Sequence, residues 1–491
     1  MGCGAGPVRP PTRGYRGWSP VILGDVFSHL FTQDTMDFLV TYLPLFMMLT
    51  LAVGLFSNIP VGFVLAAVGV FYALVGHFLG EFPMVAFFNF PVRVIGTIEH
   101  NTVYPAIPML LFMGVAFEKS GVARNMLECL QVLMRGVPGR LAIAVTVLGI
   151  LLGPLPGMIG VSVATLALLA LPTMLEKNYH PSLATGAVAA AGTLGVIIPP
   201  SIMLFFLSGQ MRVPMGQMFL AILIPSLMLS AMYLVYYLVK CTLDPNAAPE
   251  GETESPVQGF LNLAWYAVRS LALPVALISL VLCSIIFGWA TPSQSGAIGA
   301  AGGIGLLLLN RALTWKNMHE VIVTTVLMTS MVFFIVMAAG MFSYPFRYFG
   351  GDELIGTFLY SLGLGDWGML FVVMFIIFLL GFFMDWIEIT IITLPIFLPV
   401  LEVMDFATHV GEPQVMMMWM GVLIGLVLQT SFMTPPFGFA IFFVKGASPP
   451  SIKLTEVYRG MVPLVGVQLL TLLLVLLFPM LATGLPAFLL E

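Results

Sequence analysis

The sequence predicts a polytopic α-helical membrane protein. Of its 491 residues, 59% are hydrophobic and only 8% are charged, and the mean hydropathy is +1.05. A soluble domain carries about 25% charged residues, so 23 acids and 18 bases cannot cover the surface of soluble domains of this size. The sequence also shows long continuous apolar runs, whereas an outer-membrane barrel has alternating strands of roughly ten residues. These observations exclude a soluble enzyme, a nucleic-acid-binding protein and a disordered scaffold.

Apolar segments that can cross or enter a bilayer follow one another along the chain. A crossing takes about 20 helical residues. The predicted segments are 38–56, 60–79, 102–117, 141–175, 183–211, 216–239, 270–289, 294–310, 319–345, 369–401, 415–444 and 460–487. A straight helix over 369–401 would be about 50 Å long, whereas the hydrocarbon core is about 30 Å thick. Such a segment must break or turn back inside the membrane.

The longest segments contain helix breakers. The breaks are Gly153-Pro154-Leu155-Pro156-Gly157 in 141–175, Pro199-Pro200 in 183–211, Gly381 in 369–401 and Pro435-Pro436 in 415–444. Proline removes a helical hydrogen bond and clashes with the preceding turn. A pair of prolines therefore predicts a broken helix rather than a regular one.

The breaks occur in the same order in the two halves of the chain. Each half has a glycine-interrupted segment ending in Leu-Pro (Leu171-Pro172 and Leu398-Pro399), followed by a segment broken by Pro-Pro. Paired broken helices in corresponding positions indicate a transporter site near the bilayer midplane. The alternative is two unrelated proline kinks.

These patterns divide the chain into four parts. The basic N-terminal stretch has no continuous apolar core before Met36, so we do not expect a cleaved signal peptide. The predicted parts are 1–35, an N-terminal extension; 36–240, a first half with a hairpin near 141–175 and a broken helix at 183–211; 241–268, a polar linker; and 269–491, a second half with a hairpin near 369–401 and a broken helix at 415–444.

Asp385 and Glu388 are the acids that lie well inside an apolar run, and Thr390 follows them. If the stretch is helical, residues three apart face the same side. A carboxylate buried in the membrane usually marks an ion or substrate path. The alternative is a hairpin tip at the interface, with hydrated acids and Trp386 as an interfacial anchor.

Small and hydroxyl residues gather at the breaks. Unwound backbone and hydroxyl oxygens suit a small cation such as Na⁺, and half-helix N-termini suit an anionic substrate group. The alternative is close packing, since these residues also join membrane helices. The candidate residues are Gly157, Gly160, Ser162, Thr165, Gly192, Thr193, Pro199, Pro200, Ser201, Thr430, Ser431, Thr434, Pro435 and Pro436.

Motifs for hydrolysis or for ATP binding are not evident. We find no HExxH and no GxxxxGK[ST], so the chain does not itself use ATP through a P-loop. An ion gradient or another subunit must then supply the energy for transport. We expect no enzyme; an intramembrane enzyme with Asp385 and Glu388 as an acid/base pair is disfavoured, because catalysis does not call for repeated breaks.

The segments around both proline pairs resemble a known transporter family. Residues 189–202, Ala-Ala-Ala-Gly-Thr-Leu-Gly-Val-Ile-Ile-Pro-Pro-Ser-Ile, and residues 428–440, Leu-Gln-Thr-Ser-Phe-Met-Thr-Pro-Pro-Phe-Gly-Phe-Ala, are similar to the signatures of TRAP transporter large permease subunits, the DctM-like family. Residues 381–388, Gly-Phe-Phe-Met-Asp-Trp-Ile-Glu, resemble its mannitol/chloroaromatic-type subgroup. The resemblance spans about residues 38–485.

The resemblance implies an elevator fold of the ion-transporter superfamily, with two inverted repeats that each hold a re-entrant hairpin and a broken helix. It further implies Na⁺-coupled uptake of an organic acid anion across the cytoplasmic membrane of a bacterium or archaeon. The implied partners are a small four-helix membrane subunit and an extracytoplasmic substrate-binding protein, besides the bilayer, and no nucleic acid. Na⁺ would be held by the hairpin tips and the breaks at Gly192–Ser201 and Thr430–Pro436, and Asp385 matches an acidic position of the second hairpin. A self-sufficient carboxylate carrier of the same superfamily is the alternative.

Overall fold

The computed structural model describes residues 38–490 apart from 58, 100–102, 154–158 and 250–259. The described residues form helices and no strands. The predicted extension 1–35 and Gly157 lie outside the described residues. The helices of the first half are α3 Leu43–Leu55, α4 Val61–Phe78, α5 Met84–Phe87, α6 Asn89–Glu99, α7 Ala106–Lys119, α8 Val122–Leu133, α9 Arg140–Leu151, α10 Ile159–Glu176, α11 Pro181–Ile197, α12 Ile202–Gln210 and α13 Met215–Leu243.

The described residues of the second half are also helical. Its helices are α14 Phe260–Ile286, α15 Pro292–Leu309, α16 Trp315–Tyr348, α17 Gly351–Ser361, α18 Gly365–Leu380, α19 Trp386–Glu388, the π-turn η2 Ile389–Thr393, α20 Leu394–Val403, α21 Pro413–Met433, α22 Phe439–Ala447, α23 Leu454–Leu477 and α24 Met480–Leu490. Among the described residues, 7 helices are long and apolar enough to cross a membrane, or up to 9 if each bent pair counts as one span. The predicted polytopic helical class is therefore confirmed.

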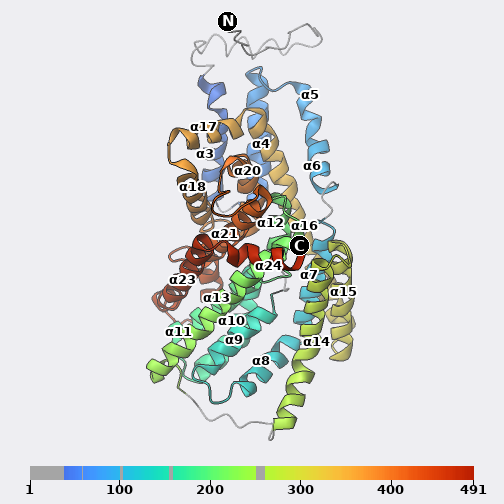
Figure 1. The fold of residues 1–491 in the computed structure, drawn as a ribbon. Helices are drawn as coiled ribbons and strands as arrows, with labels where there is room; N and C mark the ends of the chain where they lie inside the picture. The colour runs from blue at the N-terminus through green and yellow to red at the C-terminus, as the bar shows by residue number, and fades with distance from the viewer. Residues whose placement is uncertain (1–37, 58, 100–102, 154–158, 250–259, 491) are drawn as a thin grey trace.

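Two groups of helices can be followed in Figure 1. Helix α7 packs along α15 and α16, and α16 also packs against α4 and α6. The other group is built around α11, which contacts α9, α10, α21 and α23. Residues Leu183–Ile197 of α11 are all buried, so this helix forms the centre of its group.

Small residues explain how closely the helices around α11 approach. A Cβ on Gly149 of α9 would collide with the backbone of Ala191, and one on Gly186 would collide with the backbone of Gly460 on α23. Membrane helices commonly approach each other at such small residues. The Ala- and Gly-rich sequence of α11 therefore lets backbone pack on backbone from two sides.

Two differences between the observed and the predicted helix limits concern the linker and the last segment. The predicted linker 241–268 is too long, because α13 continues to Leu243 and α14 begins at Phe260. Residues 260–268 are mostly apolar and form the first part of α14. The predicted segment 460–487 is two helices, α23 and α24, which are separated at Phe478 and Pro479. Proline cannot continue the hydrogen bonding of α23, and α24 turns to pack on α13.

Candidate functional site

The first broken helix consists of α11 and α12, which are separated by residues Ile198–Ser201. The two helices are bent by 46°, and the Pro199-Pro200 peptide bond is cis. The hydroxyl of Ser201 donates to the carbonyl of Val196 instead of capping α12. The first N–H groups of α12 therefore have no side-chain cap, and the last carbonyl groups of α11 lie on the other side of the break.

The second broken helix repeats this arrangement between α21 and α22. The Pro435-Pro436 bond is also cis, and Gly438 precedes α22 without a side-chain cap. Three hydroxyl groups donate to carbonyls of their own helix: Thr430 to Leu426 at 2.8 Å, Ser431 to Leu428 at 2.6 Å and Thr434 to Thr430 at 2.7 Å. Their protons are thus committed, and each oxygen keeps lone pairs for a cation.

The first hairpin is formed by α9 and α10 and packs against both broken helices. A Cβ on Gly160 would collide with the ring of Phe443 on α22, and a Cβ on Gly192 would collide with Val163 of α10. Ser162 is buried and Thr165 is half-buried on the same helix. The structure therefore brings the described part of this hairpin next to the first break and to the short helix that follows the second.

The predicted second hairpin corresponds to α18 and the helix that runs from α19 through η2 to α20. A Cβ on Gly381 would collide with the side chain of Ser431, so the absence of a side chain at Gly381 lets α18 end against the second break. The predicted break at Gly381 and the predicted site residue Ser431, which lie in different segments, are therefore in contact.

Asp385 and Glu388 lie close together, but they do not share one face of a helix as predicted. Asp385 is the N-cap of α19 and not an interior helical residue. Its Oδ1 accepts the Trp386 N–H at 2.8 Å, and Glu388 Oε2 accepts the Asp385 N–H at 3.3 Å. This reciprocal capping box holds both carboxyl groups, each partly exposed, at the break. Thr390 is buried in η2, and its hydroxyl has no hydrogen-bond partner within the described part of the chain.

Trp386, at the start of α19 in the second hairpin, is buried in the protein. Trp386 has an exposed fraction of 0%, and its ring centroid lies 5.7 Å from that of Phe206 on α12. This packing contradicts an interfacial anchor at Trp386, which would lie at the headgroup level. Each hairpin thus contacts the short helix of the opposite half, α10 against α22 and α19 against α12.

The sequence did not single out the buried polar side chains between α11, α13, α21 and α23. Tyr233, Gln429 and Gln468 are each at most 2% exposed. Both polar atoms of the Gln429 amide and Oε1 of Gln468 have no hydrogen-bond partner among the residues described. A signal was available, because each glutamine stands inside a long apolar segment.

The fold and the paired breaks define a membrane transporter, since discontinuous helices in corresponding halves are typical of that class. Residues 48–481 match the family model described as the tripartite ATP-independent periplasmic transporter, DctM component. The chain therefore belongs to this family of transporter permeases, which confirms the resemblance of its proline motifs. Its subgroup stays a prediction.

Named relatives agree with this assignment. The chain is 26% identical over 397 residues to the C4-dicarboxylate TRAP transporter large permease protein DctM of Pseudomonas aeruginosa, covering 80% of this chain and 88% of the relative. It is 25% identical over 441 residues to the sialic acid TRAP transporter large permease protein SiaM of Vibrio cholerae, covering 88% of this chain and 96% of the relative.

The fold also resembles that of a solved transporter structure. The crystal structure of the YdaH transporter of Alcanivorax borkumensis is similar with a TM-score of 0.52 and 14% sequence identity, over 80% of this chain and 88% of that chain. This likeness concerns the fold alone.

Proposed function

We propose that this chain is the large membrane subunit of a Na⁺-coupled, binding-protein-dependent carrier that imports an organic acid anion. The observation that carries the proposal is the pair of breaks, at which the buried or half-buried hydroxyl groups of Ser201, Thr430, Ser431 and Thr434 donate their protons to backbone carbonyls. Such oxygens fit Na⁺ as the coupling ion, and the uncapped N-termini of α12 and α22 suit an anionic substrate group. Asp385 and Glu388 would lie beside this path.

The substrate class follows the relatives. Those from Pseudomonas aeruginosa and Vibrio cholerae are named for C4-dicarboxylate and for sialic acid, both carboxylic acids. We infer a carboxylate substrate, a small four-helix membrane subunit and an extracytoplasmic binding protein as partners, and the bacterial cytoplasmic membrane as the location. The alternative location is the cytoplasmic membrane of an archaeon.

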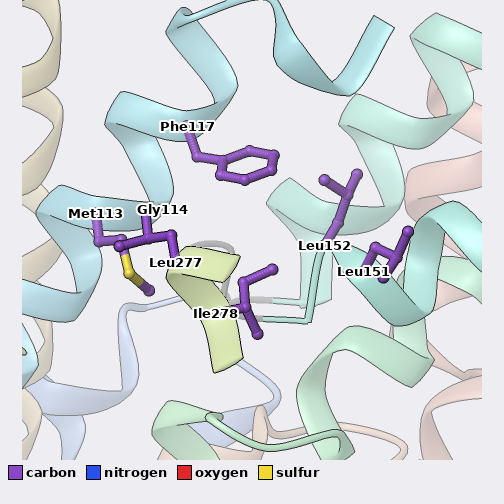
Figure 2. A pocket seen from close by; sticks show the side chains of 7 residues that line it. All are labelled: Met113, Gly114, Phe117, Leu151, Leu152, Leu277 and Ile278. Atoms are coloured by element: carbon purple, nitrogen blue, oxygen red, sulfur yellow. The ribbon is translucent and has the colours of Figure 1, made fainter. Parts of the chain in front are cut away.

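An elevator motion would move the hairpins and broken helices past the scaffold helices. A small pocket where α7, α14 and the end of α9 approach one another is lined by apolar side chains and one glycine (Figure 2): Met113, Gly114, Phe117, Leu151, Leu152, Leu277 and Ile278. No directional polar bond at these residues would oppose sliding. This apolar lining supports the elevator proposal.

Uptake by the reconstituted complex tests the ion coupling. Proteoliposomes should contain this chain and its membrane partner, with loaded binding protein outside. We expect uptake to collapse without an inward Na⁺ gradient. Undiminished uptake under a proton gradient alone would overturn the Na⁺ assignment, and full uptake without binding protein would favour the self-sufficient carrier.

A cross-link tests the motion. Met113→Cys and Leu152→Cys are introduced together into a variant that lacks the native cysteines. A bifunctional maleimide that cross-links the two new cysteines should stop uptake. The matched control is Ala116→Cys with Gly303→Cys, because a Cβ on Gly303 lies 3.0 Å from the Ala116 Cβ between two scaffold helices. Equal uptake in both cross-linked proteins would contradict the elevator.

A further inference from the structure

One direct polar contact joins the two helix breaks. The hydroxyl of Thr193, four residues before the end of α11, donates to the sulfur of Met433, the last residue of α21, over 3.2 Å. Both side chains are 0% exposed. The two residues belong to opposite halves and are separated by 240 positions in the chain.

The Thr193 proton is shared between two acceptors. The same hydroxyl also lies 3.0 Å from the carbonyl of Ala190 in its own helix. A hydroxyl carries one proton and two lone pairs, so it can donate to only one acceptor strongly at a time. If its oxygen binds a cation at the first break, the orientation of the O–H bond changes, and with it the hydrogen bond to Met433.

Met433 directly precedes the second break in the chain. Its neighbour Thr434 accepts the N–H of Gly438 at 3.1 Å and donates its own N–H to Ser431 at 3.3 Å. The position of Met433 therefore affects the backbone on both sides of the cis proline pair. Methionine suits such a contact, because its sulfur is a weak, polarizable acceptor on a flexible chain.

Two further donors hold the sulfur from other helices. Gln468 Nε2 on α23 lies 3.4 Å from Met433 Sδ, and the Tyr233 hydroxyl on α13 lies 3.9 Å away. Both residues are buried. The sulfur thus accepts from Gln468 and Tyr233 as well as from the Thr193 hydroxyl.

We propose that the Thr193–Met433 contact couples cation binding at the first break to cation binding at the second. Met433 is a positioning residue in this scheme and need not bind the cation itself. The inference rests on the proposed Na⁺ coupling, and it adds that the two breaks bind Na⁺ cooperatively because one hydrogen bond links them.

The test is the Na⁺ dependence of uptake by the complete complex in proteoliposomes. We expect a Hill coefficient of about 2 for the wild type that falls towards 1 in Met433→Leu, with a similar maximal rate at saturating Na⁺. Leucine keeps the volume of the side chain and removes the acceptor. A merely structural role would lower the rate and leave the Hill coefficient unchanged.

The chain contains a matched control. Thr471 likewise shares its hydroxyl between a carbonyl of its own helix, Val467 at 3.0 Å, and a methionine sulfur, Met232 at 3.6 Å. Neither residue lies at a break. Met232→Leu should therefore keep the wild-type Hill coefficient.

A second variant covers the case in which Met433→Leu does not fold. Thr193→Val removes the hydroxyl and should also lower the Hill coefficient, whereas Thr193→Ser should preserve it. A cooperative Na⁺ dependence that persists in folded Met433→Leu overturns the inference, and so does a non-cooperative wild type. Wild-type uptake that does not depend on Na⁺ overturns the proposed function as well. The wild type alone therefore distinguishes the failure of the proposed function from the failure of this inference.

Discussion

The indole of Trp386 packs on the ring of Phe206, with the two centroids 5.7 Å apart. Trp386 follows the break of the second hairpin, whereas Phe206 lies on the short helix after the first proline pair. The contact therefore fixes the second hairpin against the broken helix of the other half. Because the indole is completely buried, it contributes apolar packing within the protein and not contact with lipid headgroups.

We expect Trp386→Ala to reduce the free energy of unfolding by about 3 kcal/mol, because it removes a large buried side chain and leaves a cavity. Thermal unfolding of the purified protein in detergent measures this loss. Trp315→Ala is the control, since Trp315 is 86% exposed and leaves no cavity. Equal stability of the two variants would contradict the buried packing of the hairpin tip.

The contact of Gly381 with Ser431 can be tested by adding a methyl group. We expect Gly381→Ala to destabilise the protein by about 2 kcal/mol through overpacking, because a Cβ there collides with the Ser431 side chain. Ser431→Gly in the same molecule should recover much of that loss. Thermal unfolding of both single variants and the double variant forms a double-mutant cycle.

The control for Gly381→Ala is another helical glycine with free space around it. A Cβ on Gly305 of α15 meets nothing within 4 Å, so Gly305→Ala should be neutral or stabilising by up to about 1 kcal/mol. If alanine at position 381 is tolerated as well as at 305, the two residues do not pack as described.

The breaks could be predicted from the sequence, and their packing could not. Proline and glycine act on their own helix, so Pro199-Pro200, Gly381 and Pro435-Pro436 announce interruptions without knowledge of their neighbours. The crossed contacts of Gly160 with Phe443 and of Trp386 with Phe206 depend on which helices meet in space. A single sequence contains no direct signal for such pairings.

Asp385 and Met433 show the same limit at the level of single residues. The apolar surroundings identified Asp385 as an unusual acid, but a helical reading placed it on a helix face and missed its role as an N-cap. Met433 is apolar among apolar residues in the sequence. Its polar surroundings arise only when Thr193, Tyr233 and Gln468 converge from three other helices.

Lys177 gives a pH-dependent prediction outside the membrane-spanning helices. Burial, and then the nearby Arg140, lower the pKa of Lys177 from its ordinary value of 10.5. The charged lysine thus disfavours the folded state at neutral pH. This penalty shrinks as the pH rises through the lowered pKa, where the folded protein releases the proton before the unfolded chain does.

We therefore expect Lys177→Gln to be more stable than the wild type at pH 7, with a difference in melting temperature that narrows towards pH 10. Melting curves across this range give the measurement. Lys316→Gln, at an exposed position, should follow the wild type throughout. A Lys177→Gln protein that is less stable at pH 7 would show that the lysine is instead held by favourable contacts.

The charge of Asp385 can be separated from its capping role. Asparagine keeps a side-chain oxygen that can accept the Trp386 N–H, now 2.8 Å from Asp385 Oδ1, and asparagine is as good an N-cap as aspartate. The free energy of unfolding of Asp385→Asn should therefore lie within about 0.5 kcal/mol of the wild-type value. Its Na⁺-driven uptake should fall by about 10-fold or more, because one membrane carboxylate is lost from the proposed path. Asp385→Ala should lose both properties, with about 1 kcal/mol of stability from the missing cap. Wild-type uptake by Asp385→Asn, measured in proteoliposomes with equal amounts of folded protein, would mean that Asp385 serves only to begin α19.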